Sequence, residues 1–454
     1  MGGIIQEAKY SCALGSQQTV LGIPRAIPII HAGPGCSARQ FAYLSAGAGY
    51  QGEGYAGGAQ IPCTNSSQNE VVFGGEKKLG KLIDATLDVM DGDLYVVLSG
   101  CTAGIVGDDV KQVAEDHSTG DKKVIGVDTA GFRGNNYKGH NLVLESIIEQ
   151  FVGDDFDEEA EKEKGLVNVF SVVPYQDVNW RGDLEEIKRI LTGIGLKVNI
   201  LFGYGSEGVS EWKSIPKAEL NIVLSPWVGL SAAKLCQRKY GTPFLHESVI
   251  PVGLKATSAF LRRVAKELSL DSKVVESFIE SEEKRYKSYF VAAGDFFADY
   301  SSYIPYEAYI STDDIYGVGL ADFLENELGI EVVKFYDISE PNNASKEAIK
   351  KTLEEVKPGL GERTVFEGDN ALIRKDILEN IKERKTKSVI FGSSWDREIA
   401  AETGSILVYL SIPLLDLVNI NRSYVGYNGA LKLIEDLYSG VFDKGVIANT
   451  TVEH

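Results

Sequence analysis

The chain has 454 residues, of which 44% are hydrophobic, so it is long enough to bury more than one core. Its 65 acidic side chains outnumber the 46 basic ones and give a formal net charge of −19. A surface of this sign repels nucleic acid and anionic membranes, and we exclude both as partners.

The N-terminus is polar, and no apolar run approaches the ~18 residues of a membrane span, so we expect a cytoplasmic protein. Five cysteines, an odd number in a large acidic chain, do not indicate a disulfide framework. We therefore expect reduced cysteines, some of which bind metal.

Short apolar runs recur along the chain, separated by glycine-rich turns and amphipathic helices. Because these runs are continuously apolar, they predict strands buried on both faces. Strands that alternate with helices, such as 183–192 and 253–268, indicate parallel sheets of the Rossmann type. The predicted strands are residues 26–30, 94–98, 123–127, 166–173, 197–202, 220–224 and 388–391.

Two charged segments divide the chain. Residues 153–165 are almost without apolar side chains and predict a solvated linker. The charged helical stretch 271–287 precedes the apolar run 289–293, which we expect to begin a further unit. We predict an α/β fold of three Rossmann-like domains with mainly parallel sheets, at residues 1–164, 165–288 and 289–454.

Four of the five cysteines fall in the first quarter of the chain, beside turns. Cys36 closes the segment 31–36, which follows a predicted strand, and Cys101 directly follows another strand. Cys12 precedes a glycine in a loop. α/β folds place ligands at the carboxyl ends of parallel strands. Glycines there let backbone amides donate to thiolate, and thiolates on separate loops can hold one face of an iron–sulfur cluster.

The cysteines also have a simpler interpretation. Cysteines that bind no metal pack as small hydrophobic residues, and the chain contains no CxxC pair and no zinc-finger spacing. Cys236 lies in a predicted helix among leucines and is expected to be a core residue, whereas the turn around Cys63 leaves either role open. Spacing alone does not choose between metal binding and packing for Cys12, Cys36 and Cys101.

Eight segments, in the same order along the chain, resemble the nitrogenase component 1 family. This family contains both subunits of dinitrogenase, the scaffolds that assemble their cofactor, and the dark-operative tetrapyrrole reductases. One such segment would be weak evidence, but order and spacing agree over nearly the whole chain. The segments are residues 12–13, 31–36, 71–79, 101–102, 105–109, 131–134, 392–394 and 424–429.

The resemblance implies three Rossmann-like domains around a central cleft. Cys12, Cys36 and Cys101 match the family's three thiolates for a cluster at the subunit interface, which is either an eight-iron P-cluster or a four-iron cluster. The cluster would be shared with a homologous second subunit in an α2β2 heterotetramer. A separate ATP-dependent iron–sulfur reductase protein would deliver the electrons.

These expectations describe an oxidoreductase subunit that relays low-potential electrons to an active site for dinitrogen or another small substrate. One alternative is a scaffold for assembly of a nitrogenase-type metal cofactor, and another is a reductase acting on carbon–sulfur bonds or tetrapyrroles. A third is a sugar- or nucleotide-binding α/β protein with incidental cysteines. The sequence assigns no catalytic residue.

Two positions depart from the cofactor-bearing type of subunit. Ser225 stands where that subunit has a cysteine ligand, and Val425 stands where it has a histidine ligand. Serine is a poor iron ligand beside a thiolate, and valine has no donor atom. The chain therefore resembles the beta-type, P-cluster-sharing subunit, although residues 71–79 and 131–134 look more like the cofactor-bearing or scaffold type.

Two glycine motifs have plainer interpretations than nucleotide binding. Residues 75–82 nearly match a P-loop, but Leu82 replaces the hydroxyl that would reach magnesium. Residues 203–208 match G-x-G-x-x-G, but Pro216 follows early and leaves no room for the long helix of a dinucleotide site. We expect the second motif to be a loop that lines an inter-domain cleft.

Several charged or polar side chains near the cysteines are assigned structural roles. Asp108 and Asp109 lie where a helix begins and are expected to cap it. His31 stands at a strand end and is expected to hydrogen-bond a loop rather than bind metal. Arg25 and Arg133 are expected to form surface ion pairs, although either would also support an anionic cluster.

Overall fold

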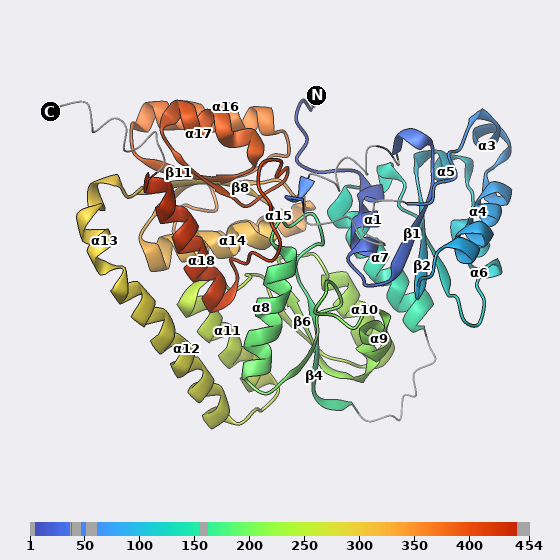
Figure 1. Cartoon of the computed structure of the whole chain (residues 1–454), viewed down its shortest axis with the longest axis horizontal. Helices are drawn as coiled ribbons and strands as arrows, with labels where there is room; N and C mark the ends of the chain where they lie inside the picture. Colours follow the sequence, from blue (N-terminus) through green and yellow to red (C-terminus); the bar gives the residue numbers. More distant parts are fainter. Residues whose placement is uncertain (1–4, 37, 39–46, 51–60, 154–161, 443–454) are drawn as a thin grey trace.

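The computed structural model describes residues 5–36, 38, 47–50, 61–153 and 162–442. They fold into three units, each built on a sheet with helices packed against it (Figure 1). Every strand pair within these three sheets is parallel. The predicted α/β fold with parallel sheets is therefore confirmed, and the exact limits of the three domains stay a prediction.

The first unit lies on the right in Figure 1. Its elements are η1 (Ala13–Ser16), α1 (Gln17–Leu21), β1 (Ala26–His31), α3 (Gln68–Phe73), α4 (Glu76–Val89), β2 (Leu94–Ser99), α5 (Cys101–Val106), α6 (Val110–Asp116), β3 (Val124–Val127), η3 (Gly131–Arg133), α7 (Asn136–Ile147) and η4 (Ile148–Val152). The strands have the order β1-β2-β3. Ile27 and Ile29 pack with α4 and α6, whereas Ile30 faces the opposite core. β1 is thus buried on both faces, as its apolar sequence predicts.

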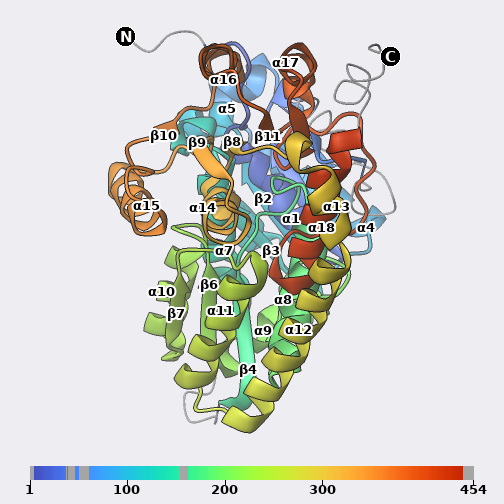
Figure 2. The same ribbon diagram turned by 90° about the vertical axis from the view of Figure 1, so that its left-hand side faces the viewer.

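The second unit has the strand order β5-β4-β6-β7. Its elements are β4 (Glu163–Phe170), α8 (Trp180–Gly193), β5 (Lys197–Asn199), α9 (Val209–Ser214), η5 (Ile215–Lys217), β6 (Ala218–Leu224), α10 (Leu230–Tyr240), β7 (Phe244–Glu247), α11 (Gly253–Glu267) and α12 (Ser272–Ala292). The long α12 runs along the outside of the second and third units (Figures 1 and 2).

The apolar run 289–293 was expected to begin a further unit, but it forms the end of α12. Phe290 stacks on Tyr286, one helical turn earlier, with ring centroids 6.5 Å apart. This spacing of aromatic residues is that of a helix face, so the apolar run continues the helix that precedes it.

The third unit has the strand order β10-β9-β8-β11-β12. Its elements are α13 (Gly294–Asp299), η6 (Ser301–Tyr303), β8 (Glu307–Thr312), α14 (Asp314–Phe323), η7 (Leu324–Leu328), β9 (Glu331–Asp337), α15 (Asn343–Val356), β10 (Thr364–Phe366), α16 (Asn370–Arg384), β11 (Ser388–Gly392), η8 (Ser394–Asp396), α17 (Arg397–Thr403), β12 (Ile406–Tyr409), α18 (Gly426–Ser439) and η9 (Gly440–Phe442).

The N-terminal segment ties the third unit to the first. The fully buried Lys9 ammonium donates to Ser311 over 2.9 Å and pairs with Asp396 over 3.2 Å. Three residues later the same segment reaches Cys12, whose backbone pairs with that of Asn135 in the first unit. The position of Cys12 is therefore fixed by two units at once.

Buried apolar side chains from all three units form one continuous core, in which Leu14, Trp180 and Val425 represent the three units. None of the described helices combines the length and the apolar character that crossing a bilayer needs. The shared core holds the carboxyl ends of the three sheets in fixed positions, and these ends carry the candidate site.

Candidate functional site

The loops that follow β1 and β2 lie side by side at the carboxyl edge of the first sheet. His31 at the end of β1 pairs in register with Ser99 at the end of β2. The amide of Gly100 donates to the carbonyl of His31 over 2.9 Å, and a Cβ at Gly100 would lie 2.5 Å from a side-chain carbon of the β1 loop. Glycine permits this close approach, which brings together the loops of Cys36 and Cys101.

Cys12 and Cys101 both border Gly131, which lies in η3 beyond the end of β3. The Gly131 amide donates a hydrogen bond to Sγ of Cys101 over 3.1 Å. A Cβ at position 131 would lie 2.9 Å from Sγ of Cys101 and 3.7 Å from Sγ of Cys12. The missing side chain of Gly131 therefore leaves room for both sulfur atoms.

The three predicted ligands are exposed thiols. Cys12, Cys36 and Cys101 all lie at the surface, whereas Cys236 is buried in α10. Burial raises the pKa of the Cys236 thiol to about 12, which favours the protonated thiol of a core residue. Cys236 is a core residue, as predicted from its helix.

Cys63 is half-buried beside the loop that follows β1. Its backbone pairs with that of Ile30, its thiol donates to the carbonyl of Ala32 over 3.5 Å, and the amide of Asn65 donates to its sulfur over 3.4 Å. These contacts hold the 61–66 segment against β1. They therefore favour packing over metal binding as the role of Cys63.

In the part of the chain that the structure describes, no three His, Cys, Asp or Glu side chains surround a point that would hold one metal ion. A polynuclear cluster makes a different demand, because each thiolate binds its own iron and the cluster itself spaces the sulfur atoms. Exposed thiols on three separate loops, one of them accepting an amide hydrogen bond, fit a cluster that ligands from a second chain complete.

His31 is engaged by the protein on both ring nitrogens. Its Nδ1 lies 3.1 Å from Oγ1 of Thr64, and its Nε2 lies 2.9 Å from Oδ2 of Asp108. Asp108 also accepts from the amide of Gly75 over 2.9 Å, at the start of α4. His31 therefore hydrogen-bonds loops, as expected. Asp109 caps α6 as predicted, whereas Asp108 supports the neighbouring helix instead.

The two arginines form surface ion pairs. Arg133 pairs with Asp128, and Arg25 pairs with Asp91 and Asp93 over 3.1 and 3.0 Å. Exposed pairs of this kind contribute little to stability. Arg133 also lines a pocket between the three units.

This pocket, of about 730 Å³, opens where the three units meet. The first unit contributes Arg133 and Lys138, the second contributes Trp227 and Lys234, and the third contributes Glu340. Basic side chains thus outnumber acidic ones in the lining, in contrast to the acidic surface of the whole chain. An anionic group would be stabilised there.

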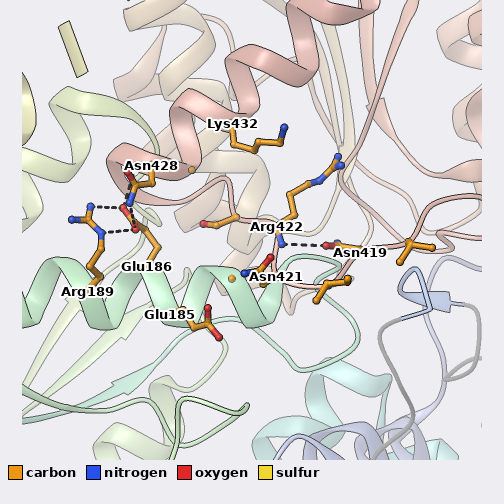
Figure 3. Close-up of a pocket in the computed structure, with 13 residues that line it drawn as sticks. Glu185, Glu186, Arg189, Asn419, Asn421, Arg422, Asn428 and Lys432 are labelled. Carbon is orange, nitrogen blue, oxygen red and sulfur yellow. Dashed lines mark hydrogen bonds and ion pairs between the residues drawn. The ribbon is translucent and has the colours of Figure 1, made fainter. Parts of the chain in front are cut away.

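A second pocket, of about 550 Å³, lies between α8 and the segment before α18 (Figure 3). Glu186 projects into the space between α8 and α18, where it binds Arg189 through both carboxylate oxygens over 2.8 Å and accepts from Asn428 over 2.9 Å. Glu186 and Arg189 thus already satisfy one another within this pocket.

The glycine motif at 203–208 lines a smaller pocket between the first and second units. The amide of Gly203 donates to the carbonyl of Gly22 over 2.8 Å, and a Cβ at Gly208 would lie 2.9 Å from the carbonyl oxygen of Pro24. The loop therefore packs against α1 and the turn before β1. This agrees with the expectation of a loop between domains.

Comparison with known proteins identifies the family. The family described as nitrogenase component 1 type oxidoreductase matches residues 11–442, which is nearly the whole chain. The chain belongs to this family. The resemblance stated for the sequence is therefore confirmed, and the family is one of oxidoreductases that includes iron–sulfur enzymes.

Relatives with different activities match this component 1 type chain about equally. A nitrogenase molybdenum-iron protein beta chain from Methanococcus maripaludis is 24% identical and spans 95% of this chain and 93% of its own length. The B subunit of a light-independent protochlorophyllide reductase from Angiopteris evecta is 26% identical, over 76% of this chain and 67% of its own. Similarity of this degree does not assign the substrate.

The solved structure titled "Nitrogenase Cp1 at pH 6.5" has the same fold. It superimposes with a TM-score of 0.80 over 100% of this chain and 96% of that chain, at 19% sequence identity. At this identity the likeness concerns the fold alone, and it agrees with the three parallel sheets of this chain.

Ser225 and Val425, the two positions at which this component 1 type chain differs from a cofactor-bearing subunit, offer no metal ligand. Ser225 is fully buried, and its hydroxyl donates to the carbonyl of Val228 over 2.7 Å. Val425 is also fully buried and packs in the shared core. That the cleft lacks a large cofactor held in the usual way stays a prediction.

Apart from Arg133 and its segment 131–134, sequence reasoning missed the residues that line the pocket between the three units. Trp227 and Glu340 each follow a buried strand by three residues, in loops after β6 and β9. The available signal was the position of polar or aromatic residues directly after apolar runs, where α/β folds gather ligand contacts. The sequence does not show which of these loops meet, because they come from different units.

Proposed function

We propose that this chain is the iron–sulfur cluster-binding subunit of a nitrogenase-like, ATP-dependent reductase. Cys12, Cys36 and Cys101 bind the cluster, of the eight-iron P-cluster type or the four-iron type, and a homologous subunit in an α2β2 heterotetramer completes it. The observation that carries the proposal is the set of three exposed thiols at the edge of the first sheet, two of which border Gly131.

Exposure of the thiols supports sharing between chains. A cluster held by thiolates at an open surface would react with water and oxygen, whereas a second chain seated on these loops would exclude both. The Gly131 amide stabilises negative charge on the sulfur of Cys101, which tunes the cluster potential. The cluster supplies one-electron redox chemistry, and the residues of this chain bind it and set its surroundings.

An exposed apolar surface next to Cys101 supports docking of a separate iron–sulfur reductase. Phe73 in α3 is 84% exposed, and Ile105 in α5 is 76% exposed. Phe132, adjacent to Gly131, is also exposed. α3 packs on α5, and a Cβ at Gly104 of α5 would lie 3.1 Å from a ring carbon of Phe132, so the three side chains belong to one surface. Large apolar side chains gathered at a surface mark an interaction site. Because α5 begins at Cys101, a reductase docked on this surface lies close to the thiols.

The pocket between the three units is the reduction site that this chain offers. Arg133 lines it, two residues along the chain from Gly131 at the thiols, so electrons have a short way to travel. The excess of basic side chains suits an anionic substrate or one that carries carboxylates. Dinitrogen or another small substrate, a carbon–sulfur compound and a tetrapyrrole are the candidates to be compared.

The experiment is a turnover assay on the complex purified without oxygen from its source. Iron and sulfide content are measured first, and each candidate substrate is then supplied with the reductase and ATP. The proposal expects iron, sulfide and ATP-dependent reduction of one of these substrates. Iron and sulfide without turnover would favour the assembly scaffold instead. A complex without iron and sulfide contradicts the proposal and favours a sugar- or nucleotide-binding protein.

A further inference from the structure

Four carboxyl groups are buried where the three units meet. Asp177 lies in the loop before α8, Asp313 and Asp314 lie at the start of α14, and Asp337 ends β9; none is more than 2% exposed. In the described residues these groups form no metal site. Four like charges in a buried place are unfavourable unless protons neutralise some of them.

The first pair of carboxyls needs a proton between its members. Asp313 accepts from the amides of Ile315 and Tyr316 over 2.9 and 3.2 Å at the start of α14, which favours its ionised form. Asp177 is also fully buried and interacts with Asp313, and two neighbouring buried carboxyls disfavour each other's ionisation. Burial next to Asp313 raises the pKa of Asp177 well above its usual range, which favours the protonated form of Asp177.

The second pair of carboxyls needs a proton as well. The Ser339 hydroxyl oxygen lies 2.9 Å from Oδ2 of Asp314 and 2.7 Å from Oδ1 of Asp337. One hydroxyl has one hydrogen to donate, so the other contact is a hydrogen bond only if that carboxyl donates. Oδ1 of Asp337 also accepts from the Ser339 amide over 2.8 Å, and Oδ2 of Asp314 also accepts from the Trp227 indole over 2.7 Å. The contacts therefore place one proton on this pair without choosing between its members. Burial raises the pKa of Asp337 to about 7 and that of Asp314 well above its usual range.

Groups from other elements face the same carboxyls. Tyr137 of α7 is fully buried, its hydroxyl has no partner among the described residues, and burial together with the four carboxyls raises its pKa. The charge of Asp183 in α8 raises the pKa of Asp177, and the charge of Lys346 in α15 lowers the pKa of Asp337. Both effects are smaller than the effect of burial on the same carboxyls. A buried hydroxyl without a partner points to a bound hydrogen-bonding molecule such as water.

The second pair of carboxyls, Asp314 and Asp337, is connected to residues that line the pocket between the three units. Trp227 lines that pocket and donates from its indole nitrogen to Asp314 over 2.7 Å. Asn135 also lines the pocket and donates to the carbonyl of Ser339 over 2.7 Å. The backbone of Asn135 in turn pairs with Cys12. Asp314 thus contacts a residue that lines the pocket, and Ser339, which bridges Asp314 and Asp337, contacts the residue that pairs with Cys12.

We propose that Asp177, Asp313, Asp314 and Asp337 form a buried proton store that serves a molecule reduced in the adjoining pocket. For each electron that an iron–sulfur donor delivers to the complex, one carboxylate of the store takes one proton from water. When the substrate takes the electron, the carboxyl O–H bond breaks, the proton joins the substrate and the carboxylate is restored. The transfer of these protons to a substrate rests on the proposed function. The storage of protons by the four carboxyls does not depend on it.

Infrared spectroscopy of the purified complex tests the storage. At a pH of about 6, exposed aspartates are ionised and contribute no carbonyl band of protonated carboxyls. A band of this kind that shifts in heavy water therefore reports buried carboxyls that hold protons. Asp177→Asn and Asp314→Asn should each remove a similar share of this band. Asp299→Asn, at an exposed position of the third unit, should leave the band unchanged. An unchanged band in both Asp177→Asn and Asp314→Asn, at unaltered circular dichroism, overturns the proposal.

Asp337→Asn supplies an independent variant. The wild-type band should grow as the pH falls from about 8 to about 6, because Asp337 gains its proton in that range, and the variant should lack this growth. Growth that persists in Asp337→Asn contradicts the assignment.

Proton uptake on electrochemical reduction of the complex, followed with an indicator dye, tests the use of the store. At a pH of about 8, where Asp337 is ionised, wild-type complex should take up more protons per electron than Asp337→Asn, and equal uptake overturns the coupling. A complex that accepts no electrons contradicts the proposed function, and the infrared result still decides whether the carboxyls hold protons.

Discussion

Replacing Gly131 with alanine should weaken cluster binding without unfolding the chain. Gly131 lies in a 3₁₀ turn, and its φ is outside the left-handed region, so alanine fits the backbone. The added Cβ would lie 2.9 Å from Sγ of Cys101 and 3.3 Å from Cβ of Cys12. Both separations are shorter than the ~3.5 Å at which non-bonded carbon atoms pack, and sulfur is larger than carbon.

The overlap forces Cys101 or the η3 turn to move. Overpacking of this kind costs roughly 1–3 kcal/mol, and loss of the amide hydrogen bond to sulfur costs about 1 kcal/mol more. A total of about 3 kcal/mol corresponds to a roughly 150-fold weaker hold on the cluster. We expect Gly131→Ala to retain less iron than wild type and to release iron faster to a chelator.

The matched control is Gly120→Ala in the same unit. Its Cβ would meet nothing within 4 Å, and its φ is also outside the left-handed region. Iron content, chelator kinetics and the electron paramagnetic resonance spectrum are compared between the two variants and wild type, with circular dichroism as the folding check. If Gly131→Ala matches Gly120→Ala in all of these, the sulfur atoms near Gly131 hold no cluster.

Three further predictions concern assembly, the cleft and the N-terminal segment. We expect native mass spectrometry to find two copies each of this chain and a homologous partner; a monomer with its full iron content would contradict this. Anomalous scattering at the iron edge should place no large cluster in the cleft of this chain, because Ser225 and Val425 offer no ligand; iron there would refute it. Lys9→Met leaves the charge of the buried Asp396 uncompensated and should lower the free energy of unfolding by roughly 3–5 kcal/mol. An unfolding midpoint in urea that equals that of wild type would show that the ion pair is dispensable.

Much of the fold could be predicted because the strands are continuously apolar. The runs 94–98 and 220–224 predict strands buried on both faces, and β2 and β6 lie there as central strands of parallel sheets. The burial of Cys236 and the capping role of Asp109 followed from equally local signals, namely a leucine-rich helix and a helix start.

Other features depend on which distant segments meet, and local patterns do not contain that information. The run 289–293 is apolar enough for a strand, but stacking of Phe290 on Tyr286 keeps it in α12. The proximity of Asp177 to Asp313 arises only when the second and third units pack together. The role of Gly131 beside Cys12 and Cys101 likewise requires three loops to be assembled.

The central claim is that Cys12, Cys36 and Cys101 bind an iron–sulfur cluster, and iron and sulfide analysis of oxygen-free complexes tests it most directly. Cys36→Ala and Cys101→Ala should strip iron and sulfide from the complex, because each removes one of three thiolates on separate loops. The control Cys236→Ala removes a buried thiol in α10 and should retain both elements. Unchanged iron and sulfide in both Cys36→Ala and Cys101→Ala would contradict the claim.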